Sequence, residues 1–502
     1  MKWSGCRAGM TELILAAVRL PAGDGPDGPL NLHLRDGIVA GVSTGPLAGA
    51  AGIEVLDCDG RFVIPGLWDE HVHLNQWAMH ANRIDLSGAA SALGAAAAVE
   101  RHLLAAPGSD VTAVGVGFRD ALWPDAPTLE LLDGATGDRP TALISHDLHC
   151  VWVNNAAARR HSLAVDGSGL LREEPAFLLT RELGRLPDDV LDEWVQQAAR
   201  AAAAKGIVGL VDFEMTWNRD PWLRRFGAGF DTLRVEAGVY PQDLERAAGL
   251  GMRTGVELPG GGGLLRTGPL KVLIDGSLNT RTAYCVDPYP FGGHGLLTVD
   301  EAELLDLLVR ARGTGFVPAV HAIGDAANQL ALDAFERACI GGRIEHAQFV
   351  RADDFARFGR LGVVASVQPC HALDDRDAAD SNWPGRTDRA FPLRRLLDAG
   401  ATLAFGSDAP VAPLDPWAAM SAATTRSAFD GREPWHPAEA ITRRQALAAS
   451  TRGRGTVRVG DPADLVLLDA DPLAVPDPDF AAMPVAGTLV AGRFTYDGGM
   501  PG

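Results

Sequence analysis

Cysteine is scarce in this sequence, and its placement argues against structural disulfides. The 502 residues include six cysteines, and no two of them form a Cys-x-x-Cys pair. Cysteines scattered in this way do not suggest a disulfide framework or a zinc ribbon, and they suit a reducing compartment. We therefore predict a cytoplasmic protein without a disulfide framework.

An excess of positive charge is also missing. Lysine and arginine together number 45, against 64 aspartates and glutamates, which gives a formal net charge of −19. A protein that binds nucleic acid needs a basic face to displace counterions from the phosphates. Nucleic acid is therefore excluded as a partner, and we expect a small-molecule substrate. Whether the chain forms a homo-oligomer stays open.

Long apolar runs are missing as well. The run Leu13–Val18 is short and is flanked by Glu12 and Arg19. A membrane span needs about 20 apolar residues, and a signal peptide has different flanks. We interpret the run as a strand and expect no membrane association.

Strands and helices follow a different pattern in three regions of the chain. Residues 11–63 form short strand-like segments with a hairpin at Arg35–Asp36–Gly37. Residues 65–451 alternate strand-like and helical segments, and strand-like segments return after residue 456. The alternation predicts parallel strands buried on both faces, in a chain too long for a bare barrel of roughly 250 residues. The β-segments at the two ends of the chain could pair into a small sandwich.

Polar residues interrupt the apolar strands at several points. In PGLWDEHVH, His71 and His73 are two residues apart and so share one face of a strand. Lys271 lies inside the apolar segment GPLKVLIDGS, where a buried ammonium is costly and its pKa falls. Either this lysine reaches out to solvent, or its neutral amine reacts with CO₂ to give a carbamate that can bridge two metals.

Three more polar residues end apolar segments, namely His321, His346 and Asp408. Singly, each is more often a core histidine or a turn residue than a ligand. Together with the two histidines and the lysine above, they fall in order on successive strand–helix units. This joint pattern predicts a site for two divalent metals.

Several segments together resemble the amidohydrolase superfamily, and specifically its YtcJ-like branch, the amidohydrolase 3 group. The main segments are PGLWDEHVH, KVLIDGSLNTRTA, VHAIGDAAN, RIEHAQ, VQPCH and GSDAPV. The resemblance implies an α/β fold, a distorted (β/α)₈ TIM barrel with a small composite β-sandwich domain from both termini. Residues 1–63 and 455–502 would form the sandwich and 64–454 the barrel, with an inserted subdomain at about 80–180.

The resemblance further implies a set of metal ligands. They are His71, His73, Lys271 as a CO₂-derived carbamate, His321, His346 and Asp408. Two divalent ions are expected, zinc first, with manganese or iron as alternatives. The predicted reaction is hydrolysis of an amide-type C–N bond, as in an N-acyl, N-formyl or cyclic amide, by a metal-activated water.

Catalytic and substrate-binding roles complete this prediction. Asp408 would accept the proton of the water and pass it to the leaving nitrogen, and His321 or His371 would stabilise the oxyanion. His149, Arg281, His371 and Trp68 are candidate substrate contacts. For Arg281 a surface salt bridge and for His149 a structural hydrogen bond are equally good explanations. Trp68 and Trp152 suggest an apolar or aromatic substrate group, or simply packing.

Other classes of protein explain part of the pattern. A barrel lyase or isomerase acting through a Schiff base on Lys271 would explain the alternation and the lysine, but not the histidines. A non-catalytic binding protein would explain the acidic composition but not the ligand set. A mononuclear-metal hydrolase or deaminase also stays open.

Overall fold

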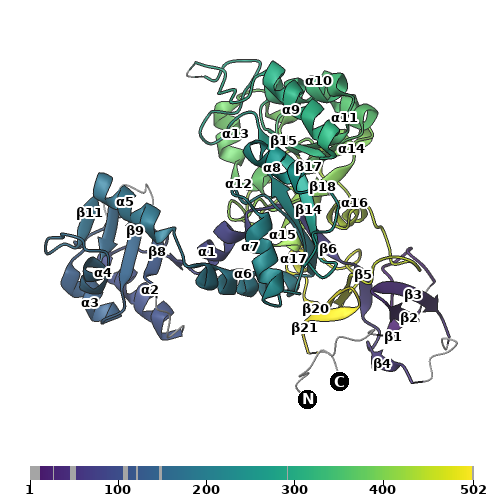
Figure 1. Ribbon diagram of the computed structural model, residues 1–502, viewed down its shortest axis with the longest axis horizontal. Coiled ribbons are helices and arrows are strands. Elements are labelled where there is room, and N and C mark those ends of the chain that lie inside the picture. Colours follow the sequence, from purple (N-terminus) through teal and green to yellow (C-terminus); the bar gives the residue numbers. More distant parts are fainter. Residues whose placement is uncertain are drawn as a thin grey trace. The chain divides into compact units, whose positions relative to one another are not determined.

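The computed structural model describes residues 12–26, 28–45, 52–105, 111–119, 123–145, 150–290 and 292–499 (Figure 1). The chain divides into two compact units. The first unit holds the residues up to Trp77 and those from Gln196 onward, and the second unit runs from Ala78 to Val195. Helices α1 (Leu74–Ala81) and α6 (Asp188–Ala203) contain the two boundaries.

A nearly closed barrel of eight parallel strands forms the centre of the first unit, as the sequence predicted. Its strands pair in chain order. They are β6 (Leu67–Val72), β12 (Ile207–Asp212), β13 (Arg234–Val239), β14 (Leu265–Leu273), β15 (Pro318–Ala322), β16 (Gly342–His346), β17 (Val363–Val367) and β18 (Leu403–Phe405). The first and last strands meet just beyond β18, where the Asp408 amide donates to the His71 carbonyl at 2.7 Å and the His73 amide to the Ala409 carbonyl at 3.0 Å.

Helices follow most of the barrel strands. They are α7 (Arg219–Gly227), α8 (Leu244–Gly249), α9 (Glu301–Thr314), α10 (Asp325–Ala338), α11 (Phe355–Leu361), α12 (His371–Asp374), α13 (Arg376–Asn382), α14 (Leu393–Asp398), α15 (Pro416–Thr425) and α16 (Arg443–Ser450). One more helix, α17 (Asp477–Ala481), lies further along the chain, beyond the barrel. Their ends carry the expected signals: the Asp300 side chain caps α9 and Gly315 ends it in a left-handed conformation. No helix of the described residues is long and apolar enough to cross a membrane.

Two four-stranded sheets come from the two ends of the chain. One has the order β3-β2-β1-β4 and the other β21-β20-β19-β5. Their strands are β1 (Leu13–Val18), β2 (Leu30–Arg35), β3 (Ile38–Ser43), β4 (Glu54–Asp57), β5 (Phe62–Pro65), β19 (Leu465–Leu468), β20 (Val485–Val490) and β21 (Arg493–Asp497). Buried residues of both sheets, such as Leu32 and Leu467, belong to one hydrophobic cluster. The predicted hairpin joins β2 to β3 through Asp36 and Gly37, which both have positive φ.

The second unit has its own sheet, with the order β11-β10-β9-β8-β7. Its elements are β7 (Ile84–Asp85), α2 (Ala92–Ala105), β8 (Ala113–Phe118), α3 (Leu129–Thr136), β9 (Thr141–Ser145), β10 (Cys150–Val153), α4 (Asn155–Arg160), β11 (Leu170–Arg172) and α5 (Glu174–Leu183). Trp152 is fully buried in this unit's core, edge-on to Trp123. Trp152 is therefore a packing residue of the second unit, and the predicted substrate contact His149 lies outside the described residues.

Candidate metal centre

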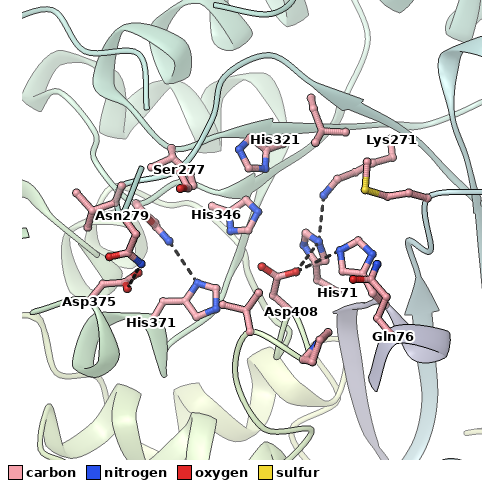
Figure 2. Close-up of a pocket in the computed structure, with 18 of the residues that line it drawn as sticks. His71, Gln76, Lys271, Ser277, Asn279, His321, His346, His371, Asp375 and Asp408 are labelled. Carbon is pink, nitrogen blue, oxygen red and sulfur yellow. Dashed lines mark hydrogen bonds and ion pairs between the residues drawn. The ribbon is translucent and has the colours of Figure 1, made fainter. Parts of the chain in front are cut away.

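The six predicted ligands line one cavity of about 280 Å³ at the carboxyl ends of the barrel strands (Figure 2). They come from β6 and the residue after it, from β14, β15 and β16, and from the loop after β18, and they are His71, His73, Lys271, His321, His346 and Asp408. Parallel strands of a barrel bring their carboxyl ends to one face, so residues far apart in sequence can converge there.

Asp408 lies at the centre of the closest contacts. Its Oδ1 is 3.3 Å from Nε2 of His73 and 3.4 Å from Nε2 of His71, and Nζ of Lys271 is 3.1 Å from that same His71 nitrogen. One potential ligand atom from each of His71, His346 and Asp408 lies within 4.8 Å of the other two. These three residues are therefore close enough to share a single ion.

The backbone at two of these residues is strained. His346 has a φ of 76° and Asp408 a φ of 57°, in the left-handed region that side chains other than glycine rarely adopt. Such a conformation costs of order 1–3 kcal/mol and persists only where the surroundings hold it. Among the described non-glycine residues with positive φ, His346 and Asp408 are the two that line the cavity.

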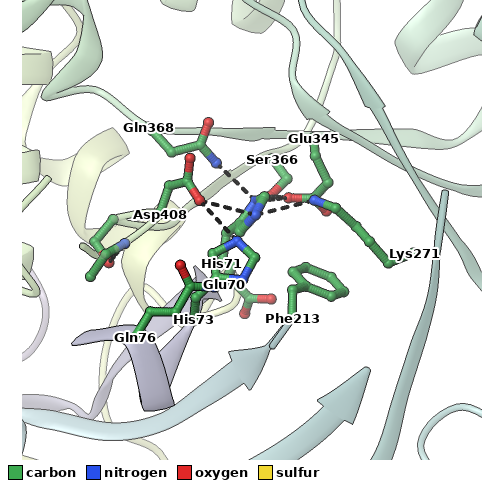
Figure 3. A network of polar contacts seen from close by, with 12 residues as sticks. Glu70, His71, His73, Gln76, Phe213, Lys271, Glu345, Ser366, Gln368 and Asp408 are labelled. Carbon is green, nitrogen blue, oxygen red and sulfur yellow. Dashed lines mark hydrogen bonds and ion pairs between the residues drawn. The ribbon is translucent and has the colours of Figure 1, made fainter. Parts of the chain in front are cut away.

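A buried carboxylate orients His71 (Figure 3). Nδ1 of His71 lies 2.7 Å from Oε2 of Glu345, and the Ser366 hydroxyl donates to the same carboxylate oxygen at 2.7 Å. A carboxylate at Nδ1 favours the tautomer that carries its proton there and leaves Nε2 free to bind a metal. This is the arrangement that typically supports a metal-binding histidine.

Two arginines continue this network away from the cavity. Arg343 contacts Glu345 at 2.5 Å and Glu70 at 2.8 Å, and Arg452 joins Glu70 at 2.6 Å to Glu236 at 2.5 Å. The guanidinium groups hold the pKa of Glu70 below its ordinary value although burial alone would raise it. The carboxylates behind His71 are therefore charged, paired and fixed.

The candidate ligands in the cavity have the protonation states that bind a metal cation. Burial, reinforced by the nearby Lys271, lowers the pKa of His71 to about 4 and that of His321 to about 3. Burial alone would raise the pKa of the Asp408 carboxyl, but the surrounding histidines hold it well below its ordinary value. Neutral imidazoles and an ionised carboxylate are the forms that bind metal.

Two buried ring nitrogens also need a partner. Nδ1 of His73 and Nδ1 of His346 are buried and have no hydrogen-bond partner among the described residues. Buried polar atoms are nearly always paired, so an unpaired ring nitrogen in a cluster of candidate ligands is a place where a ligand or ion fits. The donor set and these nitrogens therefore fit a divalent metal.

Lys271 has the environment that carbamate formation needs. It is 2% exposed, and Nζ lies 4.5 Å from the centre of the Phe213 ring. Burial lowers the pKa of Lys271 to about 8, although the carboxylates of Glu345 and Asp408 oppose the shift. With a pKa of about 8, roughly one-tenth of this amine is uncharged and nucleophilic at pH 7, against well under ~0.1% for an ordinary lysine.

Of the three predicted substrate contacts among the described residues, one lines the cavity and two do not. His371 lines the cavity, whereas Arg281 is exposed and does not. Trp68 packs with Val208 beneath the Arg452 guanidinium, which lies 3.3 Å from its ring centre. The alternation that puts His71 on one face of β6 puts Trp68 on the other, so the prediction that Trp68 contacts substrate in this cavity was wrong.

Several functional candidates were missed from the sequence. Glu345 directly precedes His346 in a buried strand, and a charged residue in an apolar strand was the signal used for Lys271. Asp275 accepts hydrogen bonds from the amides of Ile323 and Gly324 and lies 3.4 Å from Nε2 of His321. Burial raises the pKa of Asp275 to about 7. No local sequence pattern indicates the hydrogen-bond partners of Asp275.

Comparison with known proteins identifies the class. The family model described as "Amidohydrolase family" matches residues 54–496, and the chain therefore belongs to the amidohydrolase family. This confirms the family that the sequence motifs predicted, and it makes the chain a hydrolase of the amidohydrolase superfamily.

Individual relatives agree with this assignment. The chain is 26% identical to YtcJ of Bacillus subtilis (strain 168), across 93% of this chain and 96% of that protein. It is 27% identical to an N-substituted formamide deformylase of Arthrobacter pascens, across 90% and 91% of the two chains. A solved structure described as an uncharacterized metal-dependent hydrolase from Pyrococcus furiosus has a TM-score of 0.75 at 26% identity, covering 92% of this chain and all of that one. The similarity to YtcJ supports the YtcJ-like branch.

Proposed function

We propose that this chain cleaves an amide-type C–N bond in a small molecule, using two divalent metals, zinc first, held by the six residues at the carboxyl ends of the barrel strands. The observation that carries the proposal is the convergence of His71, His346 and Asp408 within 4.8 Å, with Lys271 3.1 Å from His71. Divalent metals bound there would polarise a carbonyl and lower the pKa of water.

The residues of the chain supply the proton transfers in this proposal. Asp408 is ionised and central, so it can accept a proton from the attacking water and return it to the leaving nitrogen. His371 lines the cavity from the start of α12 and can donate to the developing oxyanion. His321 is held by the Gly276 carbonyl, 3.2 Å from its Nε2, which suits an orienting role beside ligation.

Lys271 would act as a carbamate. The uncharged Nζ would attack the carbon of CO₂, so that an N–C bond forms while one C=O π bond opens and its electron pair moves to oxygen. The nitrogen would then lose a proton to solvent, which leaves an anionic oxygen ligand. The lowered pKa of Lys271, about 8, supports this step because it supplies the neutral amine.

We further propose that the substrate carries no negative charge near the scissile bond. The described lining includes no arginine, and Lys271 is its one lysine, while Asp375 adds a second carboxylate to that of Asp408. Met215, Leu273 and Val411 offer apolar surface. A neutral N-substituted formamide fits this lining better than an N-acyl amino acid, whose carboxylate would need a cationic anchor. The name of the Arthrobacter pascens relative supports the same substrate class.

A metal measurement and a pair of substrates test the proposal. Purified, chelator-free protein should contain about two divalent metals per chain, and it should hydrolyse N-benzylformamide at least ~10-fold faster, by kcat/KM, than N-formylphenylalanine. One metal per chain would favour the mononuclear alternative. No metal, together with inactivation by borohydride in the presence of a carbonyl substrate, would instead favour the lyase with a Schiff base on Lys271.

Among the described residues, Cys58, Cys285, Cys339 and Cys370 form no disulfide. This supports the proposal of a reducing, cytoplasmic location.

A further inference from the structure

Two buried side chains next to the metal ligands form a contact that the mechanism above does not use. Gln348 lies two residues after His346, and His371 is the first residue of α12. Both are at most 4% exposed and both line the cavity. His371 is labelled in Figure 2. Nε2 of Gln348 lies 3.3 Å from Nδ1 of His371.

With the Gln348 amide nitrogen facing the ring, this contact favours one position for the imidazole proton. An amide nitrogen can only donate hydrogen bonds, so Nδ1 of His371 must be the acceptor. In a neutral imidazole the proton then sits on the other nitrogen, Nε2. Gln348 therefore favours the tautomer in which His371 presents an N–H group at Nε2.

That N–H group has no partner within the described protein. Nε2 of His371 is buried and lacks a hydrogen-bond partner, and the ring is stacked at 16° to the His346 ring with their centres 6.1 Å apart. A buried donor beside the ligand cluster calls for an acceptor brought by a ligand. The carbonyl oxygen of a substrate is such an acceptor.

Main-chain hydrogen bonds fix the backbone at both residues. The amide of Phe391 donates to the Gln348 carbonyl at 2.5 Å, and the amide of His371 donates to the Gln368 carbonyl at 3.1 Å. Since the two main-chain segments are fixed separately, the Gln348 amide can fix the orientation as well as the tautomer of the imidazole.

We propose that Gln348 is a positioning residue that holds His371 as the hydrogen-bond donor to the carbonyl oxygen of the substrate. The inference rests on the proposed amide hydrolysis for the identity of the acceptor. The tautomer itself does not depend on it, because it follows from the contact between Gln348 and His371.

The tautomer can be measured directly. In zinc-loaded enzyme labelled with ¹⁵N-histidine, the His371 signal, identified by its loss in His371→Phe, should show a protonated Nε2 and an unprotonated Nδ1. In Gln348→Met, which keeps the length of the side chain but removes the donor, the two nitrogens should move toward averaged shifts. A wild-type His371 protonated at Nδ1 would overturn the proposal, because the Gln348 amide would then be accepting.

Kinetics on N-benzylformamide give the second test. His371→Phe should lower kcat by ~10²-fold, the low end for loss of an oxyanion donor, and Gln348→Met by ~10-fold, with KM nearly unchanged in both. The double variant should be no slower than His371→Phe alone, because Gln348 acts through His371. Gln329→Met is the matched control, since Gln329 pairs with Arg351 and does not line the cavity.

The outcomes separate the two proposals. Fully additive effects in the double variant, or a rise in KM alone for Gln348→Met, would overturn the positioning role. A wild-type enzyme that cleaves no amide would contradict the proposed function, while the ¹⁵N measurement would still decide whether Gln348 sets the His371 tautomer.

Discussion

Replacing Glu345 by glutamine would neutralise the carboxylate that orients His71. Glu345 is fully buried and contacts Nδ1 of His71 at 2.7 Å, the Ser366 hydroxyl at 2.7 Å and Nε of Arg343 at 2.5 Å. Glutamine has the same shape, and its one oxygen can still accept from His71. The change therefore removes charge and one acceptor without opening a cavity.

The size of the effect follows from these contacts. Mutation of a residue that supports a metal-binding histidine typically lowers metal affinity 10–100-fold, and because glutamine keeps the acceptor for His71 we expect the low end, about 10-fold or about 1.4 kcal/mol. Removing one member of a buried ion pair costs about 3–5 kcal/mol of unfolding free energy when the other charge is left buried without a partner. Arg343 keeps Glu70 at 2.8 Å, so we expect a smaller loss, about 2 kcal/mol, for the metal-free protein.

Two measurements and a matched control test this reasoning. Competition with a chelator gives the metal affinity, and urea unfolding of metal-free protein gives the stability. Glu236→Gln removes the same charge at the outer end of the network, where Glu236 is 15% exposed and contacts Arg452 but not His71. It should change stability by less than about 1 kcal/mol and leave metal affinity unaltered. Equal metal affinity in wild type and Glu345→Gln would refute the contribution of the Glu345 charge to metal binding by His71.

Two further variants test the ligands themselves. Lys271→Ala should lose metal and activity, and short carboxylates such as formate should restore part of both by replacing the carbamate oxygens; a fully active Lys271→Ala would reduce this lysine to a packing residue. Asp408→Asn should fold normally and keep at least one metal, but it should lower kcat and kcat/KM together by at least ~10²-fold, because a positioned base acts in the transition state. An increase in KM alone, with kcat intact, would instead make Asp408 a substrate-binding residue.

The barrel, and the convergence of the six candidate ligands on one cavity, could be predicted because polar residues interrupt strands that are otherwise apolar. Strand alternation places His71 and His73 on one face, and the order of strands in a parallel barrel brings their ends together. The same rule could have removed Trp68 from the substrate contacts, because it is an odd number of residues from His71. The error arose because Trp68 was chosen for its nearness to His71 in the sequence. The alternation of side chains along a strand, and not nearness, determines which face of the strand each side chain is on.

The supporting contacts could not be predicted because they join residues that no local pattern relates. Arg452 and Glu70 are separated by 382 positions, and Gln348 and His371 by 23. A charged residue in an apolar strand indicates that a partner exists, but which arginine or glutamine supplies it depends on how the strands pack. Glu345 could have been suspected from the sequence, whereas its pairing with His71 and Arg343 could not.

The closure of the barrel joins two candidate ligands through a contact between residues far apart in the sequence. The hydrogen bond from the Asp408 amide to the His71 carbonyl joins the first strand of the barrel to the segment after the last, across 337 residues. The two joined residues are themselves candidate ligands, with their side chains 3.4 Å apart. Assembly of the site and closure of the barrel are therefore one structural event. A metal bound by both residues would stabilise the closed barrel by mass action, since the ligands are together only when the barrel is closed.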